Sequence, residues 1–381
     1  MKSHRFAVLG LAGLTLWMAP ARADLTWEHS GQLRLTKFKQ PVMKFKVFTN
    51  LTPSRHRMMF QYVVNPTALG GMGGMMGGPK EMQAFGASLG VPIFALAQMG
   101  GAEPNPLQGS VAMVQRFDDG QFIAYASLPG KYVSEPIQDM LTKYRFDPWK
   151  KMAPKLSQNE PPVLTQEQRA RLGAEVRAAI APYTGRVWKT YFRELSEKRT
   201  IAGMEGHGYR LTMLFNTENP FAGAGRWVRV AMEWWVAGEL PGDEDVAKLR
   251  EAALKTIGRD YKSSTSMWLN ETPRVMWEML PEEIHQAAYT LFPPPDAATD
   301  SAEFKRANMP LTMTLTISLP PGLREQTGDI VAELNLVRRS TDALPERVFE
   351  APPGYKRVPL EDIMKQFEEA AKSAKPPIPG M

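Results

Sequence analysis

One short motif has the spacing of a catalytic nucleophile. Gly86, Ser88 and Gly90 match the Gly-x-Ser-x-Gly pattern, in which a serine occupies a sharp turn between a strand and a helix. Here a Gly- and Met-rich stretch precedes the serine, where that turn needs a buried strand. Neither His207 nor His285 has a recognisable triad context. We therefore interpret Ser88 as a loop residue and expect a protein that is not an enzyme.

Three methionines provide the one candidate for a metal site. Met72, Met75 and Met76 lie within five residues, and thioether sulfur is a soft ligand that suits Cu(I). The same residues also suit a flexible apolar loop that contacts a membrane or a ligand. The histidines are too far apart in the sequence to show a metal-ligand spacing. We expect no cofactor, and we keep the three methionines as a weak Cu(I) candidate.

Large apolar side chains are candidates for lining a ligand pocket. They are Trp234, Trp268, Trp277 and Met313. Indole rings and flexible thioether side chains both suit an adaptable apolar cavity. Core packing explains these residues equally well, so the sequence leaves both interpretations open.

The first 23 residues have the three-part layout of a secretory signal peptide. Lys2 and Arg5 form a basic start, residues 6–17 are almost entirely apolar, and Ala21 and Ala23 are the small residues of a cleavage site. The apolar run is too short for a settled helix across a bilayer core of about 30 Å. We expect cleavage between Ala23 and Asp24, and export to a bacterial periplasm.

Composition narrows the function classes. Removal of residues 1–23 removes three basic residues and no acidic one, so the net charge falls from +6 to +3. No dense basic stripe with interleaved aromatic residues is present, which argues against a nucleic-acid partner. Cysteine is absent, so folding depends on a hydrophobic core without disulfides. After the signal, no run has the length of a membrane helix, so the mature chain is expected to be soluble.

Strand patterns dominate both halves of the chain. Alternation of apolar and polar residues predicts strands in six stretches: 25–64, 111–135, 187–215 with a break at Gly203–Gly208, 227–236, 311–319 and 330–338. Asp118-Asp119-Gly120 predicts a hairpin turn. Helical patterns are fewer and begin near Thr165, Asp243, Pro273 and Leu360.

These patterns predict the α+β class, with an antiparallel sheet and a few segregated helices. We expect a Gly/Met-rich loop at 65–109, a Pro-rich connection at 148–164, and a C-terminal helix with a frayed tail at 359–381. A division into two domains near residue 160 is an alternative. We prefer one continuous sheet over residues 24–358, because the C-terminal strands are too few to form a sheet alone.

Four segments resemble an uncharacterised family of exported bacterial proteins in the lipoprotein-carrier superfamily, which has the LolA/LolB-like fold. They are Arg116–Gly120 with Lys131-Tyr132, Lys198–Gly203 with Gly208-Tyr209-Arg210, Met232–Val236, and Val348–Tyr355. Their order and spacing match the family from about residue 110 to 356. The Gly/Met-rich tract departs from the pattern, as do Glu205 and His207, where many relatives carry Cys.

The resemblance implies a strongly curved antiparallel sheet, a half-barrel whose concave face is covered by helices. Carriers with this fold hold acyl chains between the sheet and the helices. The matching motifs are structural, since Gly203 and Gly354 suit turns while Phe349 and Tyr355 suit a core. No catalytic residue is implied.

Two functions follow as hypotheses. The first is a periplasmic, non-enzymatic carrier for an acyl chain, a lipid or a lipoprotein. The second is a structural or interaction protein of the cell envelope that fills its own concavity with side chains and binds no small ligand. The size of the cavity distinguishes them, because a drug-sized ligand needs a few hundred Å³.

Overall fold

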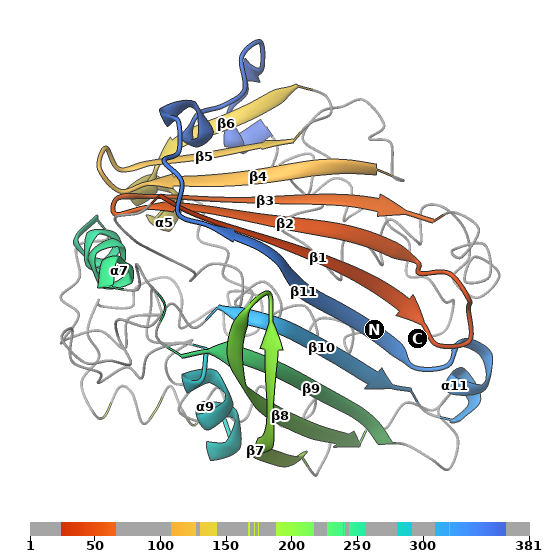
Figure 1. Ribbon diagram of the computed structural model, residues 1–381. Coiled ribbons are helices and arrows are strands. Elements are labelled where there is room, and N and C mark those ends of the chain that lie inside the picture. Colours follow the sequence, from red (N-terminus) through yellow and green to blue (C-terminus); the bar gives the residue numbers. More distant parts are fainter. Residues whose placement is uncertain are drawn as a thin grey trace.

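Regular alternation of apolar and polar residues produces long strands, and these assemble into one sheet (Figure 1). The structure is a computed structural model. It describes residues 24–65, 108–126, 130–142, 188–216, 227–238, 240, 244–256, 280–291, 309–319 and 321–362, with the helical positions 167, 171 and 174.

The sheet has twelve strands in the order β12-β6-β5-β4-β3-β2-β1-β11-β10-β9-β8-β7. Their bounds are β1 Leu25–Leu35, β2 Met43–Thr52, β3 Arg55–Val64, β4 Gln108–Arg116, β5 Gln121–Ala126, β6 Lys131–Pro136, β7 Trp188–Ile201, β8 Met204–Asn216, β9 Trp227–Ala237, β10 Pro310–Ser318, β11 Ile330–Ser340 and β12 Lys356–Arg357. Neighbours pair antiparallel except β12, which is parallel to β6. Pairing of β1 with β11 joins the two halves of the chain, so the strands on both sides of the Pro-rich connection share one sheet.

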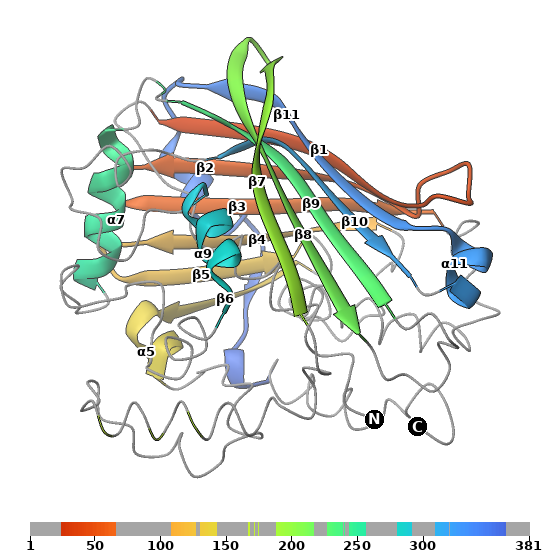
Figure 2. The same ribbon diagram turned by 90° about the horizontal axis from the view of Figure 1, so that it is seen from below.

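The helices are short and lie apart from the strands in sequence. They are α5 Ile137–Thr142, α7 Glu244–Thr256, α9 Glu282–Tyr289 and α11 Pro321–Thr327, with the 3-10 turn η2 Glu346–Phe349. The predicted α+β class with a curved, open antiparallel sheet is confirmed. Figure 2 shows α7 at one end of the strands and α9 beside β7–β9, both on the inner side of the curve. Among the described residues, no helix combines the length and the apolar character needed to cross a membrane.

Two hydrophobic clusters attach these helices to the inner side of the sheet, which we call the concave face. Leu249 of α7 packs with Trp27, Leu51 and Leu311 at the start of the sheet's central strands. Ala287 of α9 packs against Trp234 on β9. Burial of such side chains, at about 25 cal/mol per Å² of apolar surface, is the main term that holds each helix in place.

The C-terminal segment, residues 341–362, wraps around the β6 edge. Phe349 is 1% exposed and packs on Val114 and Tyr125 of the convex face, whereas Leu360 packs on Val133 of the concave face. Between these two anchors, β12 pairs with β6. The segment therefore covers a strand edge that would otherwise offer free hydrogen-bonding groups to another chain.

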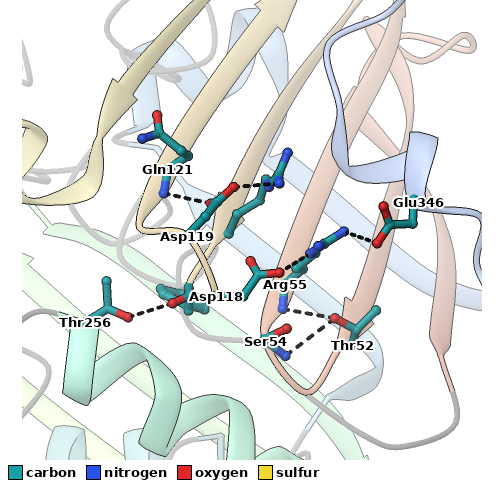
Figure 3. Close-up of polar contacts among 10 residues, drawn as sticks. Thr52, Ser54, Arg55, Asp118, Asp119, Gln121, Thr256 and Glu346 are labelled. Atoms are coloured by element: carbon teal, nitrogen blue, oxygen red, sulfur yellow. Dashed lines mark hydrogen bonds and ion pairs between the residues drawn. The ribbon is translucent and has the colours of Figure 1, made fainter.

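Charged side chains fix this wrapping segment to the strand ends (Figure 3). The guanidinium of Arg55 donates to Asp118 at 2.6 Å and to Glu346 at 3.0 Å, which joins the β2–β3 turn, the β4–β5 turn and η2. The hydroxyl of Thr256 on α7 donates to the carbonyl of Phe117 at 3.1 Å. The predicted turn at Gly120 is confirmed by its φ of +68°.

The expected break at Gly203–Gly208 is wrong in its extent. The turn occupies Ala202 and Gly203 alone, and β8 begins at Met204. Gly206 and Gly208 lie inside the strand because side chains pack over them. A Cβ on Gly208 would lie 2.5 Å from the indole nitrogen of Trp235. These two glycines allow the close approach of neighbouring side chains within a continuous strand and do not interrupt it.

The other predicted elements differ from the structure mainly in their ends. The helix expected near Pro273 is α9, which begins at Glu282, and the helix expected after Pro359 begins at Leu360. Positions 167, 171 and 174 are helical and exposed, which agrees with the helix expected from Thr165. Of the loop expected at 65–109, residues 66–107 lie outside the described residues, and positions 108 and 109 already belong to β4. The whole of the connection expected at 148–164 lies outside the described residues.

Replacement of Gly31 by Ala tests the packing of the central strands. A Cβ at Gly31 would lie 2.4 Å from the carbonyl oxygen of Glu333 and 2.4 Å from the Phe45 ring, so backbone must shift. We expect a loss of about 1–3 kcal/mol in the free energy of unfolding, measured by urea denaturation. Gly238→Ala is the matched control, since a Cβ there meets nothing within 4 Å. Equal stability of the two variants would contradict the close packing at Gly31.

Candidate functional site

Pairing register places apolar side chains next to one another across the concave face. One row crosses β3, β2, β1, β11, β10, β9 and β8 through Tyr62, Phe45, Gly31, Leu334, Met313, Trp234 and Tyr209. The next row crosses β2 to β7 through Met43, Leu33, Ala332, Leu315, Met232, Leu211 and Phe192. Neither row contains a charged side chain, because most charged residues of these strands alternate to the convex face; Glu194, which pairs with Tyr209 on the edge strand β7, is an exception.

Many apolar side chains of the concave face, in these two rows and next to them, are only half-buried. They include Met43, Phe45, Leu33, Leu334, Leu315, Ile317, Met232 and Val230. By contrast, Leu249 of α7, Trp27 in the same cluster, and Trp234 in the α9 cluster are at most 2% exposed. The concave face is thus fully buried where the two helices pack, and its side chains are more exposed along β2, β1, β11 and β10 toward the strand ends away from α7.

Aromatic side chains occupy both flanks of the half-buried region. Phe45 stacks on Phe60 with ring centroids 5.3 Å apart, and Phe60 stacks on Tyr62 at 6.0 Å. On the other flank, Tyr209 and Phe192 stack against each other at 5.9 Å. The residues between the two aromatic groups are aliphatic, which gives an apolar surface without hydrogen-bonding groups.

Two of the four predicted pocket residues lie side by side on this face. Met313 pairs with Trp234 across β10 and β9. Trp234 is fully buried, and its indole nitrogen donates to the hydroxyl of Thr290 at 2.9 Å, so this residue attaches α9 to the sheet. Met313 is half-buried beside it and packs against the same cluster.

The remaining predicted site residues lie outside the described residues. They are Trp268, Trp277, the methionines Met72, Met75 and Met76, Ser88, and Ala23 of the cleavage site. Asp24 is described, and its carboxylate accepts a hydrogen bond from the backbone of Leu344. In the described part of the chain, no three His, Asp or Glu side chains gather in a way that could hold a metal ion.

Two histidines are buried on the concave face, His29 in the alternating series of Leu25 and Trp27 on β1 and His56 in that of Met58 on β3. This alternation was the available signal for their burial. His29 is 1% exposed and lies 2.9 Å from the carbonyl oxygen of Pro310. His56 is 6% exposed, and its Nδ1 donates to the side-chain oxygen of Gln115 at 3.2 Å. Burial lowers the pKa of both groups, that of His56 to about 4. Its Nε2 has no hydrogen-bond partner within the described residues, which suits the neutral ring.

The convex face beyond the wrapping segment is polar. Thr312, Thr314 and Thr316 form a column on β10, and Glu233 and Glu333 stand on the neighbouring strands. The alternation of residues 311–319 was the available signal for this column, but it was interpreted only as a strand.

Comparison of the sequence with protein-family models gives no match, and comparison with curated proteins gives none either.

His56 makes stability depend on pH. Its pKa of about 4 in the folded protein lies below the ordinary 6.5, so the unfolded chain takes up the proton first as pH falls. We expect His56 to contribute stability above pH 6.5 that is lost as pH falls toward 4, by up to about 3 kcal/mol. The free energy of unfolding should therefore depend less on pH in His56→Gln.

The measurement is urea denaturation between pH 7 and pH 4. Wild type is measured under the same conditions, and circular dichroism at pH 7 checks that His56→Gln keeps the fold. An unchanged slope in His56→Gln would show that this ring is not buried in its neutral form.

Proposed function

We propose that the protein is a non-enzymatic carrier that binds an acyl chain, as a lipid or the lipid part of a lipoprotein, against its concave face. The observation that supports this is the uncharged, half-buried aliphatic region of the concave face, which adjoins the parts that α7 and α9 cover. A solvent-contacting apolar surface of this kind is typical of an interaction or ligand site.

The chemistry of this region favours an alkyl chain over a polar ligand. Leu33, Ala332 and Leu315 form its centre and offer no side-chain donors or acceptors. Each methylene group transferred from water to such a surface contributes about 0.8 kcal/mol. Ten methylene groups would contribute about 8 kcal/mol before ordering costs, enough for measurable binding.

The predicted signal peptide makes an envelope lipid the natural source of that chain. A chain exported to the periplasm would meet acyl groups of membrane lipids and lipoproteins there. Localisation in the periplasm is part of this proposal, and release of residues 1–23 on export is its direct test.

A second candidate function is an envelope structural or interaction protein. The fully buried Trp234 beneath α9 favours it, because a helix already covers that part of the concave face. If side chains fill the remaining region as well, no small ligand is bound.

Native mass spectrometry of the protein purified from a bacterial periplasm separates these two functions. We expect an added mass of acyl species in near-stoichiometric amount, identified by solvent extraction and lipid analysis. A bare protein mass that membrane lipids do not change would overturn the carrier and favour the second candidate.

A glutamine at the centre of the apolar region should reduce loading. Leu315→Gln places an amide among Ala332 and Met232, where it finds no partner in the rows described above. We expect the affinity for the acyl chain to fall at least about fivefold, with a matching loss of loaded protein, since an unpaired amide costs roughly 1–3 kcal/mol in such a setting.

Leu214→Gln is the matched control, because Leu214 is half-buried on β8 and belongs to the convex face. Both variants are compared by the ratio of loaded to free mass and by circular dichroism. Equal loading of the two variants would exclude the concave face as the binding surface.

A further inference from the structure

A polar groove runs along β10 on the convex face, opposite the acyl region. Its floor is the threonine column of Thr312, Thr314 and Thr316, whose short side chains lie between longer ones on β9 and β11. The hollow has a volume of about 310 Å³, which reaches the lower end of the range for small-molecule sites. The wrapping segment covers β4 and β5 on this face, so the groove lies on the uncovered half.

The groove wall on the β11 side is held in place by hydrogen bonds. Glu333 accepts from Gln32 at 2.7 Å and from Arg34 at 3.0 Å. Asn335 accepts from the hydroxyl of Thr312 at 2.6 Å. Polar groups that are oriented before a ligand arrives lose little freedom on binding it.

The wall on the β9 side is fixed in the same way. Glu233 forms an ion pair with Arg210 of β8. Arg199 lies over the indole ring of Trp235, with its guanidinium carbon 3.9 Å from the ring centroid, and donates to Glu197 at 2.9 Å. The absence of a side chain at Gly208 allows the indole to lie there, because a Cβ would meet its nitrogen at 2.5 Å.

The charges of the groove balance. Three guanidinium groups and three carboxylates line or support it: Arg34, Arg199, Arg210, Glu197, Glu233 and Glu333. A charged ligand would leave one sign in excess and disturb pairs that are already formed. Among the described residues, the hydroxyls of Thr314 and Thr316 make no hydrogen bond, so the floor offers donors and acceptors to a neutral ligand.

From this balance and the fixed polar walls we infer that the groove is a binding site for a neutral, linear oligosaccharide. A sugar chain carries many hydroxyl groups and no charge, so it matches a row of hydroxyls flanked by acceptors and guanidinium donors. Thr312 and Thr316 are about 13 Å apart along β10, so the groove suits a short chain of rings better than one ring. This site is separate from the proposed acyl site and does not depend on it.

Isothermal titration of the whole exported chain with maltotetraose, cellotetraose and chitotetraose tests the inference. We expect at least one of these neutral probes to bind. Thr314→Tyr fills the groove and should weaken that binding at least tenfold, whereas Thr314→Val removes one hydroxyl and should weaken it about fivefold. Thr212→Val on β8, on the same face outside the groove, is the control and should bind as wild type.

Acyl loading in Thr314→Tyr, measured by native mass spectrometry, should remain at the wild-type level, which separates this site from the concave face. Absence of binding by all three probes would overturn the inference. Binding that Thr314→Tyr leaves unchanged, in a variant with wild-type thermal stability, would also overturn it.

Discussion

Alternation of side chains along the strands is the constraint on which the rest of this structure depends. In an open sheet of twelve strands, every second residue of each strand contributes to the same face. Where these residues are apolar, most of that face must be shielded from water. Here α7 covers one end of the central strands and α9 covers β7–β9, and Phe349 and Leu360 fasten the C-terminal segment around the β6 edge. The apolar surface that the two helices leave half-buried is the basis for the proposed carrier function.

The same alternation separates two kinds of chemistry on the two sides of β10. Met313, Leu315 and Ile317 belong to the aliphatic face, and the three threonines between them belong to the polar groove. A change at one position therefore acts on one face alone. The same strand can thus contribute to an acyl site and to a polar site without either disturbing the other.

Much of the fold could be predicted because long strands leave a clear pattern. The nine residues from Leu311 to Leu319 alternate without exception, and β10 occupies Pro310–Ser318. Pairing partners could not be predicted, since β1 and β11 are about 300 residues apart and no local signal joins them. The groove was missed for the same reason: Arg199, Glu233 and Glu333 come from three strands whose order only the folded sheet defines. Trp234 and Met313 were identified by type, but that Trp234 is covered by α9 depends on tertiary packing.

The most direct test of the central claim is photocrosslinking with palmitate that carries a diazirine in its chain, followed by residue-level mass spectrometry of β10. Binding on the concave face predicts adducts at Met313, Leu315 and Ile317, with the threonines between them unmodified. A ligand that contacted both faces of the sheet could not label every second residue of β10 alone. Adducts on Thr312, Thr314 and Thr316, or equal labelling of these threonines and the apolar residues between them, would contradict binding on the concave face.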